Sequence, residues 1–289
     1  MKRLGMVAVV ALLSSCQATP GGPDWRETFH YKVESLQPIE IRQMGFPFIT
    51  VELGGDTVWL PFDTGNMVGL TLESAVFHRL ALACSSKWDR LDSGGNPIST
   101  GCIAHGQNVT VFGAMHDSIS IYEFSHERLP GLVGPGMLPG SRFTMDYEMG
   151  VMAVDGGTGP EVVPGFVSLP LVRSPRHPRL ILVQGKVRGH DVLIEIDTGK
   201  SRTTIDRELV GVLDLERTPD GVRIGRIELG PREPSVSSAR IVDTSGISEG
   251  LPMPISLGIG SDILAGFVFT VDYGARRLWI QDPTWKGKK

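Results

Sequence analysis

Two copies of the tripeptide Asp-Thr-Gly, at residues 63–65 and 197–199, are the part of the chain best suited to chemistry. Asp63 and Asp197 each supply a carboxylate, and two carboxylates held close together cannot both ionise cheaply, so one proton is shared between them. One carboxylate can take a proton from water while its protonated partner donates a hydrogen bond to an oxygen on which negative charge develops. The pair therefore predicts acid–base hydrolysis that requires no metal and no organic cofactor.

A strand is expected to position each of these carboxylates. Residues 58–62 and 192–196 are short apolar runs that end at the tripeptides, as is typical of buried strands bounded by turns. Each Asp then lies where a strand stops and a turn permitted by glycine begins. Gly65 and Gly199 allow backbone N–H groups to approach the carboxylates, because a side chain there would intrude.

The two tripeptides belong to a larger internal repeat. A single Asp-Thr-Gly is a weak motif, but two copies with matching flanks indicate duplication. Short helices are expected after both copies, near 73–82 and 206–213, with Glu73 and Asp206 as caps. The matching strand segments are 48–51 with 180–183, 143–147 with 269–273, and 151–154 with 278–280.

Composition places the chain among folded, mainly β proteins. Its 289 residues are enough for two units, each with its own core, and 41% apolar and 21% charged residues are ordinary for a globular protein. The 36 glycines and 20 prolines, with strand patterns rather than long helical periods, predict an all-β class with short helices. A net charge of −4 argues against nucleic acid as a partner.

The repeated pattern resembles the aspartic peptidases. Each half has a strand ending in Asp-Thr-Gly, an apolar-apolar-Gly element (132–134 and 258–260) and a closing Phe-Thr-x-Asp-Tyr segment. Residues 259–264 are especially similar to the bacterial retropepsin-like branch. The resemblance covers most of residues 35–285, and having both units in one chain is similar to the pepsin-like arrangement. It implies two β-barrel-like lobes with a cleft between them.

The resemblance also implies roles for the motif residues. Asp63 and Asp197 would be the catalytic pair of an endopeptidase, acting on a peptide or protein substrate without a metal or cofactor. Thr64 and Thr198 would hydrogen-bond across the junction of the lobes, since each hydroxyl can donate and accept. The lobes would form an intramolecular pseudo-dimer, so the chain is expected to be a monomer.

The residues after the two tripeptides depart from the family pattern, which has Ala, Ser or Thr there. Asn66 is expected to donate a hydrogen bond to Asp63. Lys200 leaves three alternatives open. In the first, its ammonium lies near the pair and favours two ionised carboxylates. In the second, its stem carries the charge out to solvent. In the third, catalysis is lost and the cleft only binds.

The N-terminus has the pattern of a targeting segment. Residues 1–16 combine a basic start with a short apolar stretch, and residues 13–16 resemble a bacterial lipobox in which Cys16 is lipidated. An ordinary secretory signal with an incidental cysteine is the alternative. Residues 17–34 are predicted to be a tether. The expected location is the bacterial cell envelope, on the periplasmic side of the outer membrane, with the lipid on Cys16 as the membrane contact.

Two further features lie in the first half. Cys84 and Cys102 are expected to pair in an oxidising compartment, and two free thiols are the alternative. Residues 92–97 form a turn cluster that could be the tip of the flap which, in aspartic peptidases, closes over substrate. Residues 219–221 are the shorter equivalent turn. Both turns are equally compatible with plain surface hairpins.

The sequence thus predicts four segments and one leading function. The segments are a signal peptide (1–16), a tether (17–34), an N-terminal lobe (35–158) and a C-terminal lobe (159–289). The function is that of an aspartic endopeptidase anchored by a lipid. The alternative is a catalytically inactive relative that binds a peptide or another envelope partner.

Overall fold

A computed structural model describes residues 24–282 except 126–127, 158 and 161. The fold is mainly β with a few short helices, as predicted, and the longest helices, α3 and α4, have six residues. The predicted signal peptide (1–16) with Cys16, residues 17–23 of the tether and the end of the chain after Asp282 lie outside the described residues. Within the described part, no helix is long and apolar enough to span a bilayer.

The first sheet is formed by residues 40–133. Its core strand β3 alternates buried and exposed residues, and it pairs with β4 through a two-residue turn, Gly54-Gly55, in which both residues have positive φ. This turn matches the twist of the paired strands and favours glycine. The sheet runs in the order β2-β3-β7-β8-β5-β9, with β4 on β3 and β6 on β7. The strands are β2 Glu40–Ile41, β3 Pro47–Leu53, β4 Asp56–Pro61, β5 Leu70–Glu73, β6 Ser86–Leu91, β7 Pro97–Val111, β8 Ala114–Phe124 and β9 Gly131–Val133.

The second sheet is formed by residues 182–259 and repeats this local design. Strands β13 and β14 also join through a two-residue turn with positive φ, Arg188-Gly189. The order is β19-β18-β13-β14-β21-β15-β20. The strands are β13 Leu182–Val187, β14 His190–Ile196, β15 Thr204–Asp206, β18 Gly225–Glu228, β19 Ser235–Val236, β20 Arg240–Val242 and β21 Ile255–Ile259, with a separate hairpin of β16 Arg217–Thr218 and β17 Gly221–Val222. Strand β13 begins two residues later than the start of the predicted segment 180–183.

A third sheet takes strands from both halves of the chain. Its order is β1-β11-β10-β22-β23-β12, so β10 and β22 meet at the centre. There Thr144 lies opposite Thr270, and their hydroxyl oxygens are 2.6 Å apart. The strands are β1 Leu36–Pro38, β10 Arg142–Asp146, β11 Val151–Asp155, β12 Phe166–Pro170, β22 Val268–Asp272 and β23 Arg277–Gln281.

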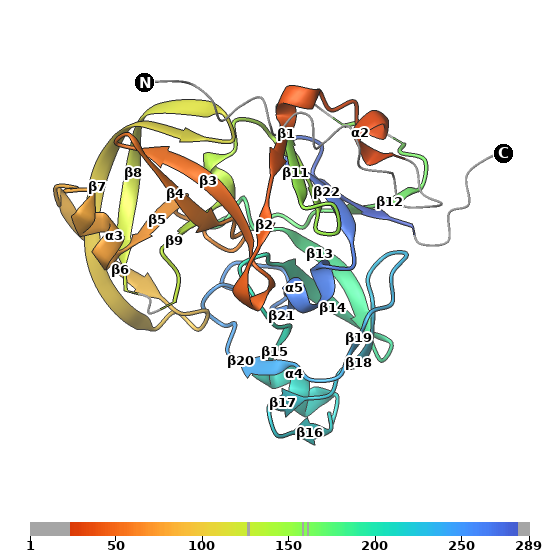
Figure 1. Cartoon of the computed structure of the whole chain (residues 1–289). Helices are drawn as coiled ribbons and strands as arrows, with labels where there is room; N and C mark the ends of the chain where they lie inside the picture. The colour runs from red at the N-terminus through yellow and green to blue at the C-terminus, as the bar shows by residue number, and fades with distance from the viewer. Residues whose placement is uncertain (1–23, 126–127, 158, 161, 283–289) are drawn as a thin grey trace.

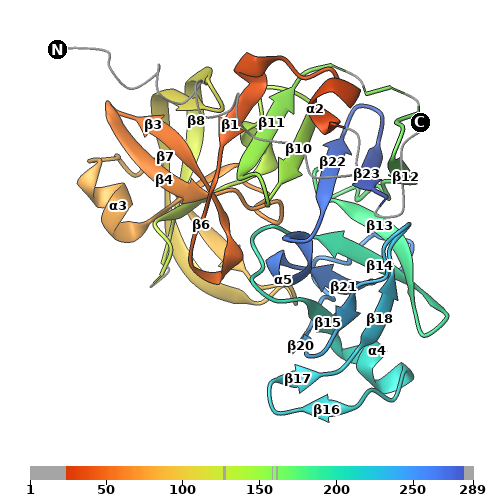
Figure 2. The same cartoon turned by 45° about the vertical axis from the view of Figure 1, so that its right-hand side comes forward.

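The three sheets share one core. The largest hydrophobic cluster includes Leu60 of β4, Ile194 of β14 and Phe269 of β22. Figures 1 and 2 show the orange and yellow strands of the first sheet apart from the teal and blue strands of the second, with the six-stranded sheet beside both. Because buried apolar side chains from all three sheets pack against one another, the sheets are held in fixed positions relative to one another.

The helices are short and lie where the repeat predicts them. Helix α3 (Ser74–Arg79) follows β5 and α4 (Arg207–Val212) follows β15. Glu73 and Asp206 cap them by accepting hydrogen bonds from Ala75 N and Glu208 N. The other helical segments are α2 Trp25–Thr28, α5 Ser261–Leu264 and the 3₁₀ turns η1 Val33–Ser35, η2 Gln43–Gly45 and η3 Pro135–Met137.

The prediction of a free tether over 17–34 is wrong for the part that the structure describes. Trp25 and Phe29 are 3% and 0% exposed, and both pack on the six-stranded sheet against Phe166 and Trp279. The indole of Trp25 donates a 2.7 Å hydrogen bond to Asp146. Burial of two large aromatic side chains stabilises the packed segment, and this gain offsets the conformational entropy that a mobile linker would lose. Residues 24–34 therefore belong to the folded body.

Candidate functional site

The two aspartates of the repeated tripeptide occupy equivalent backbone positions. Asp63 follows β4, and its N–H donates to Val133 O of β9 at 2.8 Å. Asp197 follows β14, and its N–H donates to Ile259 O of β21 at 3.0 Å. Each aspartate is therefore fixed by a strand behind it and a neighbouring strand beside it, as the sequence predicted.

The glycines bring the two aspartates face to face. Gly65 N donates to Asp63 Oδ1 and Gly199 N donates to Asp197 Oδ1, both at 2.8 Å. A Cβ atom built on Gly199 would lie 2.1 Å from Asp63 Cγ, and one on Gly65 would lie 2.7 Å from Asp197 Oδ2. Each glycine thus packs against the opposite carboxylate, and any side chain at these positions would push the two carboxylates apart.

Thr64 and Thr198 lock the two turns together, as the resemblance implied. Thr64 N donates to Thr198 Oγ1 at 3.1 Å, and Thr198 N donates to Thr64 Oγ1 at 3.0 Å. Each hydroxyl then donates across the junction to a carbonyl, Thr64 to Ile196 O at 2.9 Å and Thr198 to Phe62 O at 2.6 Å. Both side chains are buried, so all four hydrogen bonds are shielded from water.

The electrostatics of the aspartate pair, Asp63 and Asp197, favour a shared proton. Burial raises the pKa of Asp63 well above its usual range, and the negative charge of Asp197 raises it further. The hydrogen bond from Gly65 and the positive charge of Lys200 oppose this rise in pKa without cancelling it. The raised pKa of Asp63 therefore favours retention of one proton within the pair.

Lys200 turns inward, which excludes the alternative that its stem carries the charge out to solvent. Its ammonium contacts Asp197 Oδ2 at 2.6 Å and also forms an ion pair with Glu195. Burial would lower the pKa of Lys200, but the charges of Asp197 and Glu195 outweigh it and raise that pKa above its usual value. Lys200 is therefore a fixed cation beside the aspartate pair.

Glu195 is a site residue that the sequence analysis missed. Its side chain is 5% exposed. Burial raises the pKa of Glu195, the charge of Lys200 lowers it, and the charge of Asp197 raises it again. The available signal was an acidic residue inside the apolar run 192–196, two positions before Asp197 and therefore on the same face of the strand.

The expected hydrogen bond from the Asn66 side chain to the Asp63 carboxylate is not formed, and only the backbone N–H of Asn66 donates to Asp63, to its carbonyl oxygen at 3.1 Å. The side-chain amide of Asn66 donates to Gly69 O at 3.1 Å and to Leu132 O at 3.3 Å. These two bonds use both hydrogens of the amide. Asn66 thus stabilises the turn after the first aspartate and not the carboxylate itself.

A cleft of about 770 Å³ opens at the aspartate pair, and the hairpin β6–β7 covers it. The turn at 92–96 reaches the second half of the chain, where Ser93 Oγ donates to Asp243 O at 2.6 Å and Ile247 N donates to Ser93 O at 3.1 Å. On β6, Trp88 lines the cleft and donates to Glu123 O at 2.8 Å. The first turn cluster is thus a hairpin tip above the cleft.

The shorter turn in the second half also forms a hairpin. Pro219 and Asp220 connect β16 to β17, with Thr218 opposite Gly221. In Figure 1 these strands lie at the lower end of the molecule, beyond α4. The described residues that line the cleft include none from these two strands. This turn is therefore a plain surface hairpin.

A disulfide joins Cys84 and Cys102, which confirms the predicted pairing. Cys102 lies in β7, and Cys84 precedes β6, so the bond ties the hairpin that covers the cleft to the segment after α3. The constraint acts on the base of this hairpin and leaves its tip to contact the second half.

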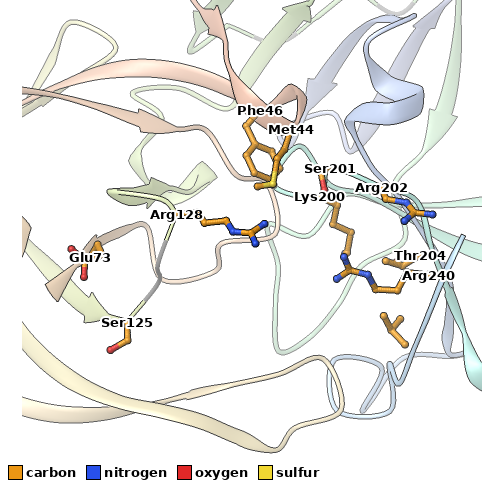
Figure 3. A pocket seen from close by; sticks show the side chains of 12 residues that line it. Met44, Phe46, Glu73, Ser125, Arg128, Lys200, Ser201, Arg202, Thr204 and Arg240 are labelled. Carbon is orange, nitrogen blue, oxygen red and sulfur yellow. The ribbon is translucent and has the colours of Figure 1, made fainter. Parts of the chain in front are cut away.

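A second pocket, of about 870 Å³, is also lined by Lys200 (Figure 3). It shares Lys200 with the cleft, but neither aspartate of the pair lines it. Its remaining walls come from η2, β5, β15, β20 and the loop residues Phe46, Ser125, Arg128, Ser201 and Arg202. No residue of this pocket was singled out from the sequence apart from Lys200, Gly199 and Glu73.

Comparisons with known proteins do not assign the chain to a family. No family model matches the sequence, and no curated protein matches it. Among the described residues, no group of three or more His, Cys, Asp or Glu side chains is placed to hold a metal ion. The functional conclusion therefore depends on the geometry around Asp63 and Asp197.

Proposed function

We propose that this protein is an aspartic endopeptidase that hydrolyses peptide bonds with water activated between Asp63 and Asp197. The observation that carries the proposal is the reciprocal geometry of the two tripeptides. Each glycine packs against the opposite carboxylate, and the two threonines exchange equivalent hydrogen bonds. A turn aspartate that only capped its own loop would not require a matched partner from a segment 134 residues away.

The proposal includes a bilobal architecture like that of the aspartic peptidases. The sheet of residues 40–133 would form the core of the first lobe (35–158), and that of residues 182–259 the core of the second (159–289). The six-stranded sheet would join the lobes, since β10 and β22 pair at its centre. The cleft at the aspartate pair would then hold an extended peptide between lobes of one monomeric chain.

The proposed reaction uses Asp63 as the acid and Asp197 as the base. Water attacks the scissile carbonyl carbon, one water proton passes to Asp197, and the proton of Asp63 passes to the carbonyl oxygen. The diol then collapses. Its C–N bond breaks, Asp197 delivers its proton to the leaving nitrogen, and a hydroxyl proton of the diol returns to Asp63. Both carboxyl groups end in their starting states without a metal or cofactor.

Glu195 reconciles Lys200 with this chemistry. An aspartate pair that shares one proton carries a net charge of −1, and Lys200 alone would bring the site to zero and favour loss of the proton. Ionised Glu195 returns the net charge to −1 while pairing with the same ammonium. The raised pKa of Asp63, which burial and the charge of Asp197 maintain in the presence of Lys200, is consistent with this compensation.

The remaining parts of the proposal concern location and partners. A lipid on Cys16 would anchor the chain at the periplasmic face of a bacterial outer membrane. Because residues 24–34 pack on the body, the segment between Cys16 and Asp24 would set the reach from the membrane, at most about 3.5 Å per residue. Peptides or proteins of the envelope would be the substrates.

The test is cleavage of an unfolded protein, such as casein, from pH 3 to pH 8. Wild-type protein is expected to cleave it, and Asp63→Asn and Asp197→Asn are each expected to lose at least about a thousandfold in kcat/KM, since either change removes the acid–base pair. Asp220→Asn, in the exposed turn of the β16–β17 hairpin, is the matched control and should retain full activity. Equal activity in all four proteins would refute the proposal.

The alternative is a binding protein with an inactive pair, and the contact between Lys200 Nζ and Asp197 Oδ2 at 2.6 Å favours it. In that case the wild type stays inert at every pH while its fold is intact. The double variant Glu195→Gln/Lys200→Met separates the two functions, because it removes the cation and its counter-charge together. Activity only in this variant would show that Lys200 silences a competent pair.

A further inference from the structure

The cleft and the second pocket differ in chemical character. Beside the aspartate pair, the cleft presents exposed apolar side chains, with Met67, Leu91 and Ile98 46%, 53% and 51% exposed. Large apolar side chains left this exposed around a hollow are typical of a binding surface. The second pocket instead collects charged side chains around Lys200.

The charge of the second pocket is mainly positive. Arg128, Lys200, Arg202 and Arg240 line it, against one carboxylate, that of Glu73. Figure 3 shows Arg128 on one side of the pocket, Arg202 and Arg240 on the other, and Glu73 at the far end. Glu73 Oε2 is engaged by Ala75 N at 2.8 Å, because this side chain caps α3.

Two of these cations have no carboxylate partner among the described residues. The guanidinium of Arg202 donates to the neutral hydroxyl of Ser238 at 2.9 Å. Within the part of the chain that the structure describes, neither Arg202 nor Arg240 forms an ion pair. Lys200, in contrast, is already compensated by Asp197 and Glu195. The arginine side of the pocket therefore carries positive charge available to a ligand.

Guanidinium groups in a concave site select for carboxylates, since their planar fork donates two parallel hydrogen bonds to the two oxygens. The pocket also has an apolar wall, because Phe46 is buried there beside Met44. An apolar wall next to cations suits a side chain with a methylene stem and a carboxylate end. Glutamate and aspartate have this form, and their charge complements the pocket.

We propose that the pocket around Arg202 and Arg240 is a subsite for an acidic side chain of the substrate. The inference rests on the proposed function, since it places this acidic residue in the same extended chain that crosses Asp63 and Asp197. An apolar residue in the cleft and an acidic residue in the arginine pocket define the substrate class. The protein would then act on acidic envelope peptides rather than on apolar peptides in general.

Three labelled hexapeptides test the inference, each with a central Phe-Phe pair. The first has Glu immediately before the pair, the second has Glu immediately after it, and the third has Gln at both places. Binding is measured by fluorescence anisotropy at pH 6, where a glutamate side chain is ionised, and cleavage of the same peptides is followed by chromatography. One of the two Glu peptides is expected to bind at least about tenfold more tightly than the Gln peptide.

The variants Arg240→Gln and Arg202→Gln should each reduce this preference by about fivefold or more, because they weaken binding of the Glu peptide more than binding of the Gln peptide. Arg217→Gln, an exposed arginine of β16 outside the pocket, is the matched control and should keep the wild-type preference. Raising the salt concentration should reduce the preference in the wild type, because screening weakens the charge interaction.

The outcomes separate the two proposals. A preference for Glu in binding without any cleavage supports the acidic subsite and contradicts the peptidase. Cleavage of all three peptides at equal rates supports the peptidase and overturns the subsite. A preference that survives both arginine substitutions also overturns the subsite, and the absence of binding and cleavage contradicts both.

Discussion

Thr64 and Thr198 hold each other through two nearly equal hydrogen bonds, each from the backbone N–H of one residue to the hydroxyl oxygen of the other, at 3.1 and 3.0 Å. The bonds join segments that are 134 residues apart in the chain and place the two aspartates on either side of one junction. A structural relationship of this kind cannot be satisfied by one half of the protein alone.

Thr198→Val is expected to destabilise the protein by about 2–4 kcal/mol. Valine keeps the shape of threonine but removes the hydroxyl, which leaves Thr64 N and Phe62 O buried without their partner. Urea unfolding measures the change. Thr198→Ser, which retains the hydroxyl, is the matched control and should lose less than half as much. A larger loss in Thr198→Ser than in Thr198→Val would show that the methyl group contributes more than the hydrogen bonds.

Asp63→Asn is expected to stabilise the protein above about pH 5. The pKa of Asp63 is raised in the folded state, by burial first and then by Asp197, so the unfolded chain releases this proton at lower pH than the folded protein does. The contribution of Asp63 is therefore fully present below the unfolded pKa and is lost as pH rises toward the folded pKa. Each unit of the shift corresponds to about 1.4 kcal/mol.

Urea unfolding of the wild type and Asp63→Asn from pH 3 to pH 8 measures this effect. The free energies of unfolding of the two proteins should diverge as pH rises, with the variant the more stable at pH 7. A difference that does not depend on pH would mean that Asp63 is not perturbed in the folded protein.

Lys200→Met is expected to destabilise the protein by about 3 kcal/mol at pH 7, because it leaves Glu195 and the aspartate pair buried without a cation. The double variant Glu195→Gln/Lys200→Met should recover most of this loss, since it removes the ion pair as a unit. A thermodynamic cycle that adds Glu195→Gln measures the coupling between the two residues. Additive effects of the two single changes would contradict the ion pair.

Reduction of the Cys84–Cys102 disulfide is expected to lower the free energy of unfolding by about 3 kcal/mol, the usual value for a closed loop of this size. Urea unfolding with and without a reductant measures the change, and Cys84→Ser/Cys102→Ser should match the reduced protein. The hydrogen bonds from Ser93 to Asp243 and Ile247 lie at the tip of the hairpin, at the opposite end from the disulfide. A reductant that changes nothing would show that the bond does not form in solution.

Much of the architecture could be predicted because it is local. The apolar runs 58–62 and 192–196 became β4 and β14 with their aspartates at the ends, and Glu73 and Asp206 cap α3 and α4 as expected. Such features depend on periodicity and on residues a few positions apart. The tether was mispredicted because Trp25 and Phe29 find their partners in distant strands.

In the candidate site, too, the local features could be predicted and the long-range contacts could not. The sequence determined two carboxylates in matched turns, with threonine and glycine beside each, because a duplicated motif fixes local geometry twice. Only the tertiary structure decided that Lys200 turns inward to Glu195, that Asn66 bonds to Gly69 and Leu132, and that Arg202 and Arg240 share a pocket. Side chains of ionisable and polar residues take the partner that burial leaves within reach, and burial is set by segments far apart in the chain.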